Sequence, residues 1–352
     1  MRIAGGVGPL IPVGGFEEGD NLAGVPLTRS WSVRLEVGWI SEREAIGNPE
    51  VGLGMMLFQV PQTDELGTPV TFYGFSHLPL FRAGPVLARL DASLGFALGW
   101  KRFDPVENPR QVAIGSSATA FFQLEGTAVL PIASRADLTL SAGYRHFSNG
   151  NLRPPNIGLN TVPLSVGLRI RSSEFTTRRQ SGIAPRDSDL RQWSFRVLPF
   201  AGVRGFAEDN RHTQQDSVYI RQRLPVAGVH GVALRRLNPH LSLGVLAGTT
   251  WDASGFGPRS QPELGTQRME YQAAFTFHAA GSLHVDMGPA RMELGVGYEF
   301  VDVSAEREVP RLFQRLGAHL LAGRFEPFVV LRALEFDRPN YIEWGLGIRL
   351  GA

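Results

Sequence analysis

The sequence predicts an all-β protein built from transmembrane antiparallel β-barrels. Three observations carry this prediction. Apolar residues alternate with polar or small ones along most of the chain, glycine occupies 41 of 352 positions, and no apolar run reaches the ~20 residues of a transmembrane helix. Alternation with a period of two is typical of strands that have one apolar and one polar face.

The stretch RLDASLGFALGW (89–100) shows the pattern clearly. Phe96 and Trp100 lie on its apolar face, whereas Arg89 and Asp91 lie on the opposite face. The same alternation continues in residues 31–39, 271–286, 291–300 and 341–350. We expect each of these segments to form a strand.

Two architectures produce such strands. A soluble β-sandwich buries the apolar face, whereas a membrane barrel turns it outward to lipid and encloses the polar face. The barrel is favoured because the alternating runs are long for a globular sheet and their polar faces mix opposite charges with glycine. Aromatic residues also recur near the ends of the runs, as expected for interfacial girdles. They are Trp31, Trp39, Trp100, Tyr144, Trp193, Trp251, Tyr341 and Trp344.

Roughly sixteen strands are expected, eight before residue 172 and eight after residue 191. Residues 173–191 are polar, do not alternate and form the expected linker. Short connections such as 131–137 alternate with long ones such as 101–117. Outer-membrane barrels typically have short turns on one side of the membrane and long loops on the other. The sequence therefore predicts two tandem eight-stranded barrels, 1–172 and 192–352. One sixteen-stranded barrel is the alternative.

Composition excludes several kinds of function. The chain has no cysteine, so disulfides and thiolate metal sites are excluded, and its net charge of +2 gives no reason to expect nucleic-acid binding. The first residues, MRIAGGVGPLIPVGG, do not read as a secretory signal. We nevertheless expect the bacterial outer membrane, because the strand pattern needs lipid around it.

The stretch GYRHFSNGNLRPPNIGLN (143–160) holds the candidate site. In the strand 136–148, Leu138, Leu140 and Tyr144 lie on the apolar face, and His146 and Ser148 continue that face by parity. In a barrel this face is the lipid-exposed exterior. A reactive pair on it would meet the acyl chains and esters of a lipid.

The pair has the residue types of a serine nucleophile and its general base. Residues two apart along a strand have Cα atoms about 6.6 Å apart, a distance that an imidazole can close toward a hydroxyl. A base within hydrogen-bond reach turns serine into a nucleophile. The asparagines and Gly150 that follow Ser148 are candidate donors to a developing oxyanion. On spacing alone, a lone His-x-Ser is better explained by a girdle histidine beside a turn serine.

The segment HFSNGNLRPPNIGLN resembles the active-site segment of the outer-membrane lipid A 3-O-deacylases, the PagL family. The resemblance extends less distinctly upstream through residues 103–130 and covers about residues 1–172. It implies an eight-stranded barrel that hydrolyses an ester-linked acyl chain of lipid A without a cofactor. It also implies Ser148 as nucleophile, His146 as general base, and Asn149 and Asn156 in support of the site or its oxyanion hole.

One position departs from the family pattern. The acid that orients the histidine falls on Asn160 in this sequence. An amide oxygen can still accept the imidazole N–H, but it cannot stabilise an imidazolium by charge. The sequence therefore leaves two functions open: an active esterase, impaired or not, and a non-enzymatic barrel, channel or structural, with a degenerate site.

The remaining candidates have ordinary explanations. Arg145 and Arg153 flank the site as candidate ligands for lipid phosphates or as a polar rim. His278, His284 and Asp286 share a polar face, which is expected to be a hydrogen-bonded barrel interior, so no metal site is predicted. The expected partners are lipid A, lipopolysaccharide and membrane lipids. Residues 192–352 carry no recognisable motif, and a soluble β-sandwich binding module is the third alternative.

Overall fold

The computed structural model describes residues 1–40, 49–150, 152–153, 155–172, 193–209, 219–237, 241–253, 273–287, 290–302, 312–334 and 338–350. Strands make up most of these residues, and their one helix is the short α1 (Gly15–Glu18). None of the described helical segments has the length and apolar character to cross a membrane. The predicted all-β class is confirmed.

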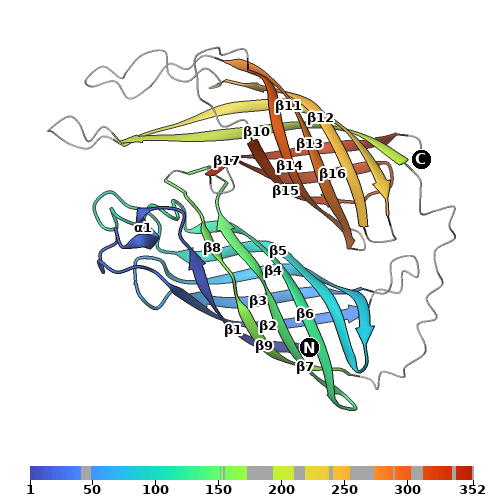
Figure 1. The fold of residues 1–352 in the computed structure, drawn as a ribbon. Helices are drawn as coiled ribbons and strands as arrows, with labels where there is room; N and C mark the ends of the chain where they lie inside the picture. The colour runs from blue at the N-terminus through green and yellow to red at the C-terminus, as the bar shows by residue number, and fades with distance from the viewer. Residues whose placement is uncertain are drawn as a thin grey trace. The chain divides into compact units, whose positions relative to one another are not determined.

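The first ring of strands is antiparallel and returns on itself (Figure 1). β1 pairs with β2 on one side and with β8 and β9 on the other, and both β8 and β9 pair with β7. Two short strands thus share the eighth place of the ring. Its members are β1 (Arg2–Ile11), β2 (Arg29–Ile40), β3 (Glu50–Gln59), β4 (Gly67–Ala83), β5 (Val86–Trp100), β6 (Ala118–Ala133), β7 (Ala136–Ser148), β8 (Leu159–Thr161) and β9 (Leu164–Ile170).

The second ring is a closed antiparallel barrel in which each strand pairs with the next and β17 pairs with β10. Its strands are β10 (Trp193–Asp209), β11 (Tyr219–Arg236), β12 (Leu241–Asp252), β13 (Ala274–Met287), β14 (Ala290–Asp302), β15 (Leu312–Leu320), β16 (Phe325–Leu334) and β17 (Arg338–Leu350). Such closure leaves no unpaired sheet edge, which is what a strand structure needs in lipid.

The chain divides into two compact units. One consists of Met1–Asn149 with Asn156–Ala184, and the other of Gly150–Pro155 with Pro185–Ala352. The expected linker, 173–191, lies outside the described residues. Its boundaries and the tandem arrangement of two barrels stay predictions.

The faces of the strands have the polarity of a membrane barrel. Leu94, Phe96 and Leu98 of β5 are each more than 40% exposed, whereas Arg89 and Asp91 of the same strand are 2% exposed. The second barrel repeats this: on β17, Trp344, Leu346 and Ile348 are exposed and Glu343 is fully buried. Apolar side chains therefore lie on the outside of the rings and charged side chains on the inside. A soluble sandwich would show the reverse.

Ion pairs fill the first ring near one end. Arg2 donates to Asp91 Oδ2 at 3.1 Å and to Glu36 Oε2 at 3.3 Å, and Arg89 Nε lies 2.7 Å from Asp91 Oδ1. Each of these buried charges therefore has an opposite partner, which offsets the cost of removing it from water.

An aromatic core fills the ring toward the other end, where β7 runs into the site. Phe147 is fully buried there, with its ring centroid 4.8 Å from that of Phe58 and 5.1 Å from that of Trp100. This packing fixes the inward face of β7, so the residues on either side of Phe147 point outward.

Trp100 corrects an expectation from the sequence. Simple alternation placed it on the outer face with Phe96, but it is 3% exposed and donates from Nε1 to Thr119 Oγ1 at 3.0 Å. The reason is Gly99, whose φ of +91° reverses the parity of the strand at its last residue. Trp100 is therefore a core residue rather than a girdle residue.

Candidate active site

The site lies where β7 ends and β8 runs beside it. The register pairs Phe147 with Leu159 on the inner face and His146 with Asn160 on the outer face. Ser148, one residue beyond Phe147, pairs with the exposed Ala120 of β6. Because directly paired residues share a face, His146, Ser148 and Asn160 are all outward-facing. The parity expected from the sequence is thus reproduced.

Asn160 holds the imidazole. Its Oδ1 lies 2.6 Å from His146 Nδ1 and also accepts a hydrogen bond of 2.6 Å from the Tyr144 hydroxyl. An amide oxygen only accepts, so Nδ1 carries the proton and Nε2 keeps its lone pair. Nε2 has no hydrogen-bond partner among the described residues. This is the tautomer that a general base needs.

Asn156 holds the serine. Its Nδ2 donates to Ser148 Oγ at 2.8 Å, and its Oδ1 accepts from the backbone N–H of Asn149 at 3.1 Å. The side chain of Asn149 in turn donates to Ser116 Oγ at 3.2 Å. Ser148, Asn149 and Asn156 are all less than 10% exposed. One amide thus fixes both the hydroxyl of residue 148 and the backbone that follows it.

Gly158 makes room for the pair. Its φ of +89° is a left-handed conformation that favours glycine. A Cβ at this position would lie 3.1 Å from His146 Cε1 and 3.7 Å from Ser148 Cβ. The imidazole and the serine side chain therefore flank the same point, and any side chain there would push against the ring.

The loop 101–117 supports this segment from the side. The backbone N–H of Gly158 donates to Ala113 O at 3.0 Å, and Ile157 N–H donates to Val112 O at 3.4 Å. The loop is itself tied down, because Gln111 donates to Lys101 O at 2.7 Å and accepts from Ile114 N–H at 2.8 Å. The site thus rests on hydrogen-bonded backbone rather than on a free loop.

A buried carboxyl lies in α1, next to the site segment. Glu17 is 1% exposed, and its Oε2 accepts from the backbone N–H of Gly14 at 3.2 Å. A Cβ on Gly14 would lie 3.0 Å from Ile157 Cδ1, so the start of α1 lies against the segment that carries Gly158. Burial raises the pKa of Glu17 to about 7.

Five of the predicted site residues come together: His146, Ser148, Asn149, Asn156 and Asn160. Gly150, with φ of +61°, and the half-buried Arg153 belong to Gly150–Pro155, which groups with the second unit. The roles expected for them stay predictions.

Arg145 does not lie where the sequence analysis placed it. It does not flank the site on the outer face, because it is a residue of β7 and is 1% exposed on the inner face. Its Nε donates to Gln123 Oε1 at 2.8 Å and its NH1 to Ser32 Oγ at 3.2 Å. Parity explains the difference: an odd residue between Tyr144 and His146 points into the ring, away from any ligand on the outer face.

Two residues of the site were missed. Tyr144 shares the parity of His146, but its hydrogen bond to Asn160 depends on strand register, which the sequence does not give. Gly158 lies two residues after Asn156 in the quoted segment, and a glycine so close to His146 and Ser148 in the sequence is the signal that would have identified it.

The arrangement has the parts of an acyl-transfer site. A serine hydroxyl and an imidazole with a free Nε2 lie on one face, an amide oxygen orients the imidazole, and amide N–H groups lie beside the serine. Such a set attacks carbonyl carbon, and its position on the outer face suits a substrate that lies in the bilayer.

Comparison with known proteins gives a family match within the first ring. Residues 30–169 match the family model of lipid A 3-O-deacylase (PagL). The match spans β2 to β9 and includes the whole candidate site. The resemblance expected from the sequence is thereby confirmed over these residues. A search of curated proteins gave no match.

Solved structures with some likeness include membrane barrels. A triple mutant of the Rhodopseudomonas blastica porin is 11% identical, covers 99% of this chain and 98% of its own, and has a TM-score of 0.17. The ferric enterobactin receptor PfeA is 13% identical, with 88% and 50% covered and a TM-score of 0.20. The siderophore receptor PirA from Acinetobacter baumannii is 11% identical, with 87% and 50% covered and a TM-score of 0.18.

Proposed function

We propose, from the match of residues 30–169 to the lipid A 3-O-deacylase family, that residues 1–172 form an outer-membrane serine esterase. Its substrate is an ester-linked acyl or hydroxyacyl chain of lipid A or lipopolysaccharide in the outer leaflet. Ser148 is the nucleophile, His146 the general base and Asn160 the residue that orients His146. Residues 192–352 form a second barrel.

The observation that carries the proposal is the pair of hydrogen bonds on either side of the reactive groups. Asn160 Oδ1 holds His146 Nδ1 at 2.6 Å, and Asn156 Nδ2 holds Ser148 Oγ at 2.8 Å. The two bonds fix the tautomer of the base and the position of the nucleophile. Both side chains face the side of the ring that carries exposed apolar residues.

The reaction follows from these positions. Ser148 Oγ attacks the ester carbonyl carbon while its proton passes to His146 Nε2. The negative charge that develops on the carbonyl oxygen needs donors nearby, and within the first unit the Asn156 amide is the candidate. The ester C–O bond then breaks, and His146 returns the proton to the departing alcohol. Water attacks the acyl-enzyme by the same route and releases a fatty acid and free Ser148.

The site has an amide at position 160, where the family pattern has an acid. A carboxylate would both orient His146 and stabilise its protonated form, whereas the amide only orients it. The transition state therefore receives less electrostatic help, and the expected activity is lower than with an acid at this position. The Tyr144 hydroxyl, which also donates to Oδ1, contributes to holding the amide in place.

The test is mass spectrometry of lipid A after incubation with refolded full-length protein, beside a Ser148→Ala control. We expect loss of one acyl mass that requires Ser148. Lipid A that stays unchanged, in the presence of protein whose circular dichroism shows folded barrels, would overturn the proposal. Conductance in planar bilayers without acyl release would then favour the non-enzymatic barrel.

A further inference from the structure

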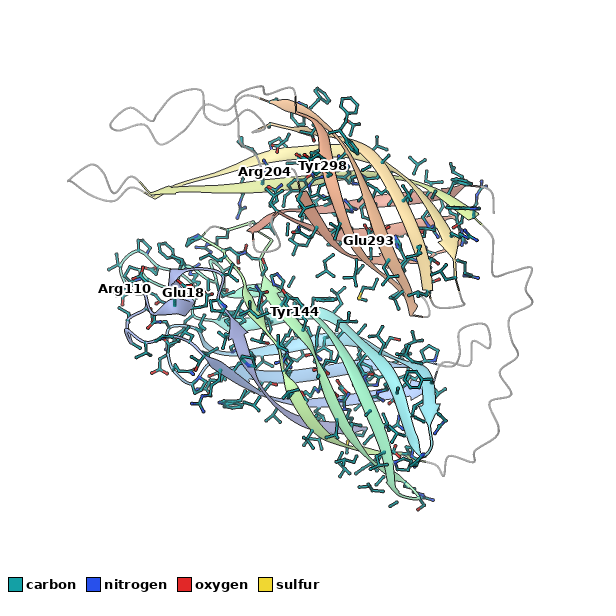
Figure 2. The ribbon with its side chains drawn as sticks, viewed as in Figure 1. Glu18, Arg110, Tyr144, Arg204, Glu293 and Tyr298 are labelled. Carbon is teal, nitrogen blue, oxygen red and sulfur yellow. The ribbon has the colours of Figure 1, made fainter. Side chains whose placement is uncertain are left out.

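Three buried side chains on neighbouring strands of the second barrel bring two imidazoles and a carboxylate together. They are His284 on β13, Glu293 on β14 and His319 on β15, each no more than 2% exposed. One ligand atom from each lies within 4.8 Å of the other two. Figure 2 labels Glu293 in this barrel. We propose that this cluster binds a divalent transition-metal ion, and that zinc is the ion it suits.

The strand register builds the cluster. His284 is paired directly with Glu293, and Glu293 is paired with Gly317, so His319 is the diagonal neighbour two residues along β15. All three side chains share the inner face of the barrel. His284 lies three residues before the end of β13 and Glu293 three residues after the start of β14, so the cluster is close to one end of the barrel.

Two glycines leave space for the imidazoles. A Cβ at Gly244 would lie 3.1 Å from His284 Nε2, and a Cβ at Gly317 would lie 3.3 Å from His319 Nε2. Both distances are shorter than ordinary van der Waals contact, so a side chain at either position would press against the neighbouring imidazole. The cluster thus depends on a lack of side chains beside it.

The donor set fits zinc. Two histidine nitrogens and one carboxylate oxygen form a common three-residue set for this ion, with the fourth position open to water or another oxygen. Glu293 Oε2 lies 2.9 Å from His319 Nε2. A zinc ion about 2.0–2.1 Å from both of these atoms needs the two only a few tenths of an ångström farther apart, and the His284 ligand atom lies within 4.8 Å of them.

The groups behind the ligands are also in place. Arg315 Nε donates to Glu293 Oε1 at 2.7 Å, which leaves Oε2 directed at the cluster. His319 Nδ1 lies 3.0 Å from Glu326 Oε1, which is an ion-pair distance without the geometry of a hydrogen bond. A carboxylate behind a ligating histidine fixes its ring orientation and raises its basicity, and this arrangement is regular at zinc sites.

A metal-free ion-pair network explains part of the cluster but not His284. Glu293 between Arg315 and His319 is satisfied without a metal. His284, however, has only the Ser282 hydroxyl at 2.9 Å from Nε2, and its Nδ1 has no hydrogen-bond partner in the described part of the chain. A buried imidazole with so few partners is destabilising, and a bond to a metal supplies the missing interaction.

The cluster differs from the three residues that the sequence placed on one polar face. His278, His284 and Asp286 share the inner face of β13, but only His284 joins the cluster. His278 Nε2 lies 3.0 Å from His230 Nδ1, and Asp286 forms an ion pair with Arg291. His278 is therefore a matched control: a buried histidine on the same strand, outside the proposed site.

The test uses the full chain, refolded in detergent and stripped of metal with a chelator. Zinc is titrated calorimetrically, and bound zinc is counted by mass spectrometry after gel filtration. We expect one zinc per chain, an affinity at least tenfold lower in His284→Ala, and unchanged binding in His278→Ala. Cobalt(II) as a second probe should give the visible absorption of a four-coordinate site in the unmutated protein and lose it in His284→Ala.

Two outcomes overturn the proposal: folded protein that binds no zinc, and equal binding by the unmutated chain and His284→Ala. Either means that the cluster is an ion-pair network only. Circular dichroism checks folding, and Glu293→Gln, which keeps the side-chain shape, gives a second ligand variant if His284→Ala does not fold. The result does not depend on lipid A hydrolysis, because the cluster and its readout belong to the second barrel.

Discussion

Asn160 Oδ1 lies 2.6 Å from His146 Nδ1, and the two residues face each other directly across β7 and β8. A contact between paired residues on neighbouring strands is held by the backbone ladder as well as by the side chains. The base of the proposed site is therefore oriented by sheet register, not by a flexible loop.

Substitution of Asn160 tests this orientation. Asn160→Asp keeps an oxygen acceptor in place and should leave lipid A hydrolysis within about one order of magnitude of the unmutated rate. Asn160→Leu removes the acceptor, so that neither nitrogen of His146 is fixed as the one that carries the proton. This substitution should lower kcat about 100-fold or more. Initial rates of acyl release measure both. Equal rates in all three proteins would mean that another residue orients His146.

Gly158→Ala should disable the site without unfolding the ring. The new Cβ would lie 3.1 Å from His146 Cε1, and we expect at least a tenfold loss of kcat because the imidazole must move. Gly84→Ala is the control: Gly84 also has positive φ, at +59°, but nothing lies within 4 Å of its Cβ position. A similar loss of activity in both variants would show that backbone strain, not contact with His146, is responsible.

Two substitutions of Asn156 distinguish its hydrogen bond to the Ser148 hydroxyl from its hydrogen bond to the backbone of Asn149. Asn156→Asp keeps the acceptor for Asn149 N–H but loses the donor to Ser148 Oγ, whereas Asn156→Ala loses both. We expect about a tenfold or greater loss of kcat in both, with the lower melting temperature in Asn156→Ala. An unchanged kcat in Asn156→Asp would exclude the hydrogen bond to Ser148 from catalysis.

Glu17 makes stability depend on pH. Because burial raises its pKa to about 7, the folded protein favours the protonated carboxyl, and stability is lost as pH rises from about 4.5 through about 7. The loss is at most about 3 kcal/mol. Unfolding in urea at pH 5 and pH 8 measures it, and Glu17→Gln should reduce the difference. Glu18→Gln, at the exposed neighbour, should reduce the difference much less, because the charge of Glu18 is the smallest of the causes that act on the pKa of Glu17.

Strand parity made much of the fold and part of the site predictable. Period-two alternation identified the outward-facing apolar side of β5 and β17 and placed His146 and Ser148 on the same side of β7. Parity failed at Trp100 because one positive φ at Gly99 reverses it, and a residue count does not reveal such a reversal.

Contacts that depend on register were not predictable. Whether Tyr144 or another residue reaches Asn160 depends on how β8 aligns with β7 after an intervening segment of the chain. The cluster of His284, Glu293 and His319 is drawn from three strands and depends on glycines at two more positions, so no local spacing marks it.

The outward direction of Ser148 also determines which measure of lipid A concentration sets the rate of the proposed reaction. A nucleophile on the outside of the ring is reached by lateral diffusion within the lipid layer rather than from bulk water. For the proposed esterase, the mole fraction of lipid A in the surrounding bilayer or micelle sets the rate. Added detergent should therefore slow hydrolysis by surface dilution, even when the amounts of enzyme and lipid A in the sample stay the same.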